Sequence, residues 1–173
     1  MKGFTPLPNG YFTKYATTPV SILPFNPKSR ITAERYIEKL AFLLTKFSAD
    51  ISLRGSTLYG IAGKGEIEIG IYPPEKKWKE IIDMLKIHFG KIGTLEKNYA
   101  RFNDVFDGFE IEVILLRGHD AFVDKKLTEY ILHSPKILRE YEKLKRKFSY
   151  SKREYMIRKN SFFEKIISTL PGV

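Results

Sequence analysis

A glycine-rich turn followed by a strand of alternating glutamate and isoleucine lies between Leu53 and Ile71. Side chains at positions i and i+2 of a strand point to the same face. We therefore expect the isoleucines of this strand to be buried, and Glu66 and Glu68 to lie together on the opposite face. Two neighbouring carboxylates repel each other unless a cation lies between them. Mg²⁺ prefers oxygen ligands and usually arrives with phosphates, so the pattern predicts a metal site for a phosphate-bearing molecule.

A second strand, Phe109–Leu116, repeats the alternation and carries Glu110 and Glu112 on one face. If both strands turn their apolar faces to a common core, the glutamates of the two strands line one patch. The alternative is an ordinary half-buried strand, which alternates apolar and polar residues and often uses glutamate as the polar one. Both interpretations stay open, and either Glu110 or Glu112 is a candidate for the third carboxylate of the metal site.

The turn before the first acidic strand contains Gly55, Ser56 and further glycines around Lys64. Glycine lets backbone N–H groups approach phosphate oxygens closely. We expect the N–H groups of Gly55 and Ser56, with the Ser56 hydroxyl, to hold phosphates. Lys64 would neutralise the charge that develops there.

Composition narrows the class of protein. The chain of 173 residues carries a formal net charge of +10 and has a pI near 9.6. This charge favours an anionic partner such as a nucleotide or RNA. A lysine-rich composition can also be a general bias of the genome, so both explanations stay open. The absence of cysteine excludes disulfides, thiolate zinc sites and a cysteine nucleophile. No apolar run reaches the length of a membrane span and no signal peptide is evident, so we expect a cytoplasmic protein without membrane contact.

The chain divides into an arm, a core and a helical tail. Residues 1–30 are rich in proline and predict an extended arm with a short strand near Tyr11–Tyr15. Residues 31–122 predict the mixed core, whose first helix begins at an N-cap Thr32. Residues 123–173 predict helices that belong to the same domain. The aromatic side chains of the arm indicate that it packs on the body: Phe4, Tyr11, Phe12, Tyr15 and Phe25.

The two last predicted helices share a strongly basic side. We expect either a solvated face or a phosphate-binding surface that contacts RNA. The residues of this side are Lys143, Lys145, Arg146, Lys147, Lys152, Arg153, Arg158 and Lys159.

The order of these elements resembles the nucleotidyltransferase superfamily. That pattern has a Gly-Ser turn, then an acidic-x-acidic strand, then a third carboxylate on a later strand. Gly55-Ser56 and Glu66-Ile67-Glu68 match its spacing. The resemblance implies an α/β (α+β) fold, with a small mixed β-sheet flanked by helices and a C-terminal helical segment.

Within that superfamily the sequence from Phe25 to Leu170 resembles the GrpB family most closely, and residues 54–71 also resemble, more weakly, the active-site strand of archaeal CCA-adding enzymes. Three blocks carry the GrpB resemblance: Gly55-Ser56-Thr57 with Gly60, Ala62 and Lys64 downstream, the strand containing Glu110 to Val113, and a tail from Tyr130 to Phe162. The resemblance implies transfer of a nucleotidyl group from an NTP, with Mg²⁺ or Mn²⁺ as cofactor and an acceptor that the sequence does not identify. It also implies that Gly55, Ser56, Thr57 and Lys64 bind the nucleotide. The catalytic and metal-binding residues would be Glu66, Glu68, Glu110 and Glu112.

The sequence also departs from these patterns. The superfamily favours aspartate at its metal positions, whereas every candidate here is glutamate. The GrpB pattern would align Glu68 with the first carboxylate and leave Gly70 at the second, whereas the superfamily pattern makes Glu66 and Glu68 the pair. A catalytically inactive nucleotide- or RNA-binding module on the same fold therefore stays open as the alternative function.

Overall fold

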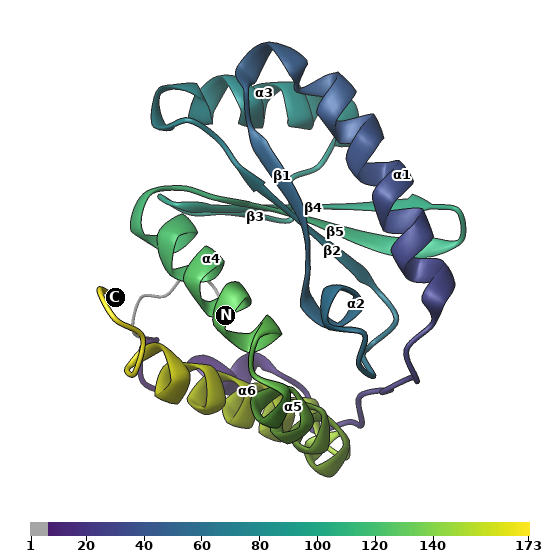
Figure 1. Ribbon diagram of the computed structural model, residues 1–173, viewed down its shortest axis with the longest axis vertical. Coiled ribbons are helices and arrows are strands. Elements are labelled where there is room, and N and C mark those ends of the chain that lie inside the picture. The colour runs from purple at the N-terminus through teal and green to yellow at the C-terminus, as the bar shows by residue number, and fades with distance from the viewer. Residues whose placement is uncertain (1–6) are drawn as a thin grey trace.

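A five-stranded mixed sheet with helices on both faces forms the centre of the protein, as the computed structural model shows for residues 7–173 (Figure 1). The strands are β1 (Asp50–Arg54), β2 (Ile67–Tyr72), β3 (Thr94–Leu95), β4 (Tyr99–Phe106) and β5 (Phe109–Leu116). The α-helices are α1 (Pro27–Leu43), α2 (Gly55–Tyr59), α3 (Trp78–Phe89), α4 (Gly118–Leu132), α5 (Pro135–Phe148) and α6 (Lys152–Ile167). This architecture confirms the predicted fold class.

The sheet has the order β1-β2-β5-β4-β3, and β2 and β5 are its parallel pair. The pairing β1–β2 is antiparallel, as are β4–β5 and β3–β4. Asp107 and Gly108 join β4 to β5 with φ values of 51° and 79°, which matches the hairpin turn that an Asp-Gly pair favours. The two acidic strands are therefore direct neighbours at the centre of the sheet.

One face of the sheet is covered by α1 and α3, and the main hydrophobic core lies between these helices and the sheet (Figure 1). The isoleucines of β2 predicted to be buried, Ile67, Ile69 and Ile71, are each fully buried in this core. Ile111 and Val113 of β5 belong to the same core. Because side chains alternate along a strand, the glutamates of β2 and β5 must point to the other face.

Helices α4, α5 and α6 stand on that other face and have a small core of their own (Figure 1). Helix α6 begins after the N-cap Ser151, whose hydroxyl accepts a hydrogen bond from the Glu154 N–H at 3.3 Å. Among the helices of residues 7–173, none combines the length and the apolar character that a membrane crossing requires.

The N-terminal part differs from the prediction in two places. Residues Tyr11–Lys14 form a 3₁₀-helix instead of a strand. Helix α1 begins at Pro27, more than a turn before Thr32, because Asn26 caps it by accepting a hydrogen bond from the Lys28 N–H at 3.1 Å. Proline is tolerated in the first turn of a helix, so Pro27 starts this helix. Phe4, which was assigned to the packed arm, lies outside the described residues.

The described part of the arm runs along α6. Arg153 donates hydrogen bonds to the carbonyl oxygens of Tyr15 at 3.0 Å and Thr13 at 2.9 Å. Backbone bonds from Lys152 to Thr18 and from Val20 to Ser149 continue this contact. The arm therefore brings the 3₁₀-helix and the following Tyr15 beside α6.

Candidate active site

Three of the four predicted glutamates come together. Carboxylate oxygens of Glu66, Glu68 and Glu112 all lie within 4.8 Å of one another. Parallel pairing places Glu68 directly beside Glu112. Glu110 is exposed and lies outside this group, because it stands one pleat nearer the hairpin end of β5. We call Glu66, Glu68 and Glu112 the carboxylate cluster.

The Gly-Ser turn lies directly against this cluster. Gly55 has a φ of +63°, which glycine adopts without strain, and a Cβ atom at this position would collide with the Glu68 carboxylate. Gly63 is equally confined, since a Cβ there would lie 2.6 Å from that of Ser56. Glycine at position 55 thus allows the turn to pack against the acidic strand, and glycine at position 63 allows the turn to close on Ser56.

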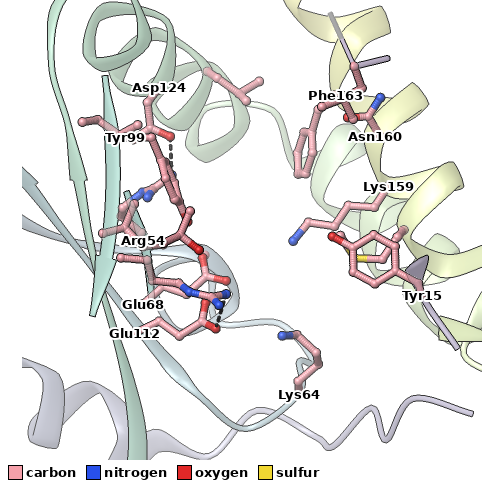
Figure 2. A pocket seen from close by; sticks show the side chains of 18 of the residues that line it. Tyr15, Arg54, Lys64, Glu68, Tyr99, Glu112, Asp124, Lys159, Asn160 and Phe163 are labelled. Atoms are coloured by element: carbon pink, nitrogen blue, oxygen red, sulfur yellow. Dashed lines mark hydrogen bonds and ion pairs between the residues drawn. The ribbon is translucent and has the colours of Figure 1, made fainter. Parts of the chain in front are cut away.

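A cavity of about 490 Å³ opens between the carboxylate cluster and helix α6. Glu68 and Glu112 line it from the sheet, and Lys159 reaches toward them from α6 (Figure 2). Tyr15 of the arm lies beside Lys159 at the border of the cavity (Figure 2). Its volume lies within the range of small-molecule sites in proteins.

Two lysines predicted to belong to a solvated or RNA-binding face are instead turned inward. Lys145 of α5 is 1% exposed, and its ammonium nitrogen donates hydrogen bonds to the Ser56 hydroxyl and, at 2.9 Å, to the Ala62 carbonyl oxygen. Lys159 of α6 is half-buried in the cavity. Both follow the apolar stripe of their helices, with Lys145 one turn after Tyr141 and Lys159 one turn after Tyr155. That periodicity was a signal in the sequence that they face inward.

The lysines and the carboxylate cluster alter each other's pKa values. Burial alone would raise the pKa of Glu68, but the charges of Lys159, Arg54, Lys64 and Lys145 outweigh it and lower the pKa to about 2. Burial and the neighbouring Glu68 raise the pKa of Glu112. Burial, together with the charge of Lys159, lowers the pKa of Lys145 to about 7, although Glu68 and Glu66 oppose that shift.

Two members of the carboxylate cluster have cationic partners of their own. Lys64 forms an ion pair with Glu66, and the Arg101 guanidinium lies 3.4 Å from a Glu112 oxygen. In the first pair, 39% of the Lys64 side chain is accessible but only 10% of the Glu66 side chain.

Arg54 forms the wall of the cavity at the end of β1. It pairs with Asp124 of α4, which also accepts a hydrogen bond from the Tyr72 hydroxyl at 2.6 Å. The Nε and Nη1 atoms of Arg54 are buried and have no hydrogen-bond partner within residues 7–173. Because Arg54 and Glu68 are opposite each other in the β1–β2 register, this guanidinium is part of the charge that faces the cluster.

The predicted nucleotide-binding residues are divided between two cavities. Gly55 lines the 490 Å³ cavity, whereas Ser56 and the buried Thr57 line a second one of about 390 Å³. Lys64 lines both cavities, and Glu66 lines the second. The carboxylate cluster therefore stands at the boundary between the two cavities.

Comparison with solved structures identifies the fold. The crystal structure of the conserved protein GrpB from Enterococcus faecalis matches with a TM-score of 0.70 and 18% identity, over 86% of this chain and 95% of that chain. The chain has the fold of GrpB. This result confirms the predicted GrpB-like nucleotidyltransferase fold. No family model matches the sequence, and no curated protein does so either.

The GrpB fold is shared, in part, with larger proteins. A chain in the structure of the GLD-2/RNP-8 complex matches with a TM-score of 0.55 and 15% identity, over 91% of this chain and 61% of that one. The Cid1 poly(U) polymerase with Mg and 3′-dATP bound matches with a TM-score of 0.50 and 10% identity, over 77% of this chain and 42% of that one. This chain thus spans less than two thirds of either protein, and at these identities the likeness concerns the fold alone.

Proposed function

We propose that this protein transfers a nucleotidyl group from a nucleoside triphosphate to a hydroxyl group of an acceptor, with Mg²⁺ or Mn²⁺ as cofactor. The observation that carries the proposal is the carboxylate cluster, whose oxygens lie within 4.8 Å of one another beside the Gly-Ser turn. Hard oxygen ligands in this number suit a small divalent cation. Cid1, which has a related fold, is described with Mg and 3′-dATP bound.

Glu66, Glu68 and Glu112 are the residues that would hold the metal. When bound, it supplies positive charge beside the triphosphate and lowers the charge repulsion that an attacking oxygen meets there. Glu68 is suited to this role because its lowered pKa, about 2, keeps it ionised at neutral pH. Glutamate is longer than aspartate, and the close approach of Gly55 holds the Glu68 side chain in one place.

Lys159 of the C-terminal helix α6 would bind the phosphates, because it lies across the cavity from the carboxylate cluster. The buried Lys145 of α5 would act through Ser56, since it donates a hydrogen bond to the Ser56 hydroxyl. In the transfer, the acceptor oxygen forms a bond to the α-phosphorus, the bond from that phosphorus to the β-phosphate oxygen breaks, and pyrophosphate leaves. The hydroxyl proton passes to water or to a carboxylate of the cluster.

The exposed basic side of α5 and α6 supports an RNA acceptor. After removal of the inward-facing Lys145 and Lys159, exposed cations remain on these helices: Lys143, Arg146, Lys147, Lys152 and Arg158. Such a surface attracts a polyanion with an affinity that falls as salt rises.

Glu68→Gln tests the metal site, with Glu110→Gln as a matched control on the exposed strand position. We expect isothermal titration with a nucleoside (α,β-imido)triphosphate to show Mg²⁺-dependent binding in the wild type and in Glu110→Gln. In Glu68→Gln, the Mg²⁺-dependent part of the affinity should fall by about 10- to 100-fold, since removal of one charged ligand weakens a metal site strongly. Equal Mg²⁺-dependent affinities in all three proteins would contradict the proposal.

The ion pairs Lys64–Glu66 and Arg101–Glu112 favour a second candidate function. In it, the cations already neutralise the carboxylates, and the protein binds nucleotide or RNA without catalysis. This candidate predicts nucleotide binding that weakens with salt and is indifferent to Mg²⁺ in the same titration.

A further inference from the structure

The 490 Å³ cavity has two chemically different ends. Glu112 and Lys64 stand at one end, and Asn160 and Phe163 of α6 stand away from them (Figure 2). The apolar side chains Leu127 of α4 and Met156 of α6 also line the cavity. Phosphates and metal belong at the charged end, so the other end accommodates a less charged part of the same ligand.

Asn160 is the unusual residue of this second end. Its side chain lines the cavity although only 8% of it is exposed. Its amide offers two donors and an acceptor, yet within residues 7–173 it makes no hydrogen bond or ion pair. A mostly buried polar side chain without a partner needs an explanation, and a ligand in the cavity that it lines is one.

Two other polar side chains that line this cavity already have partners. Asp124 accepts hydrogen bonds from Arg54 and Tyr72. Thr128 is hydrogen-bonded to Tyr59. Unlike these two groups, the Asn160 amide is left available to a ligand, as are the Nε and Nη1 atoms of Arg54 in the same cavity.

An aromatic ring lies one turn away on the same helix. Phe163 is 7% exposed and lines the cavity next to Asn160 (Figure 2). A free amide beside an aromatic surface suits a flat heterocycle that has hydrogen-bond donors and acceptors on its edge. Nucleobases have that chemistry, since they stack on aromatic rings and asparagine pairs with their edges.

We infer that Asn160 is the residue that reads the nucleobase edge of the bound nucleoside triphosphate, with Phe163 as the adjoining aromatic wall. The inference rests on the proposed function, because it takes the charged end of the cavity as the triphosphate site. Asn160 then determines which base binds, while Lys159 and the metal-binding carboxylate cluster form the site of the phosphates whatever the base.

The test compares ligands with and without a base. Wild type, Asn160→Leu and Asn160→Ala are titrated with the (α,β-imido)triphosphates of adenosine, guanosine, cytidine and uridine, and with inorganic tripolyphosphate, each with Mg²⁺. Asn160→Ala leaves open space, so it separates loss of hydrogen bonds from steric obstruction. The exposed neighbour Ser161→Ala serves as the control on α6.

We expect the wild type to prefer one base. Both Asn160 variants should bind that nucleotide about tenfold more weakly, while their affinity for tripolyphosphate stays unchanged. Asn160→Leu should also raise the thermal midpoint of the ligand-free protein or leave it unchanged, since an unpaired amide is replaced by an apolar side chain. A structural role for Asn160 would instead lower that midpoint.

Two results would overturn the inference. In the first, the Asn160 variants bind the nucleotides as tightly as the wild type, or their affinity for tripolyphosphate falls as much as their affinity for nucleotides. Asn160 then does not read the base, and the proposed function stands. If the wild type binds neither nucleotides nor tripolyphosphate, both the proposed function and this inference are wrong.

Discussion

The two faces of the central sheet use the same strands for opposite purposes. On the side of α1 and α3, β2 and β5 contribute fully buried aliphatic side chains to a continuous core. On the side of α4 to α6, the same strands carry Glu68 and Glu112, which border a cavity. Within residues 7–173, only a small apolar cluster, with Ile114 and Leu116 of β5, lies on that face of the sheet. One face therefore supplies most of the burial that stabilises the fold, and the other holds charges whose burial opposes it.

The adjacent residues Ile111 and Glu112 of β5 provide the strongest test of this difference. Ile111 is 1% exposed in the core, so Ile111→Ala should lower the free energy of unfolding by about 2–5 kcal/mol. Glu112→Gln keeps the side-chain shape on the cavity face and should change the free energy of unfolding by less than about 1 kcal/mol. The loss of the ion pair with Arg101 is offset because the repulsion between Glu112 and Glu68 is removed as well.

Urea unfolding followed by circular dichroism measures both variants. Comparable losses in the two would show that the cavity face contributes as much to stability as the core face, and the distinction between the faces would fail.

The sequence was sufficient for the core face and only partly sufficient for the cavity face. Strict alternation in β2 and β5 located the buried isoleucines and the glutamates, because a strand has a period of two. The choice between Glu110 and Glu112 needed the register of the parallel pair, which places Glu68 beside Glu112 and is a non-local property.

The helical wall of the cavity was interpreted wrongly. Lysine is usually exposed, so Lys145 and Lys159 were assigned to a basic surface although both follow the apolar stripes of their helices. Arg54 and Asn160 showed no motif, and their importance depends on packing between elements far apart in the chain. Side chains that complete a site from another element are the ones that a local pattern does not identify.

Lys145 offers a second test, because the cavity face should show a pH dependence that the core face lacks. Its pKa falls from the ordinary 10.5 to about 7 on folding, so between these values the unfolded chain holds a proton that the folded protein has lost. Wild-type stability due to Lys145 therefore rises with pH across that window, by up to about 1.4 kcal/mol per pH unit. In Lys145→Met this contribution is absent.

Urea unfolding at pH 7, 8 and 9 measures the slope. Lys147→Met, an exposed position on the same helix, is the control and should keep the wild-type slope. Equal slopes in all three proteins would mean that Lys145 keeps its proton, and that the cavity is more polar than its burial indicates.

The smallest expected effect concerns the contact between the Gly-Ser turn and the cavity face. In Gly55→Ala the new Cβ atom would collide with the Glu68 carboxylate, at a φ of +63° that alanine adopts with a strain of about 1–2 kcal/mol. Gly60→Ala is the matched control, since Gly60 has a φ of +67° but its Cβ would meet only Arg30, at 3.8 Å. Both variants should lose similar stability, whereas only Gly55→Ala should also weaken Mg²⁺-dependent nucleotide binding, because it displaces Glu68. If both variants kept wild-type binding, the position of Glu68 would not depend on the glycine beside it, and the turn would serve the fold alone.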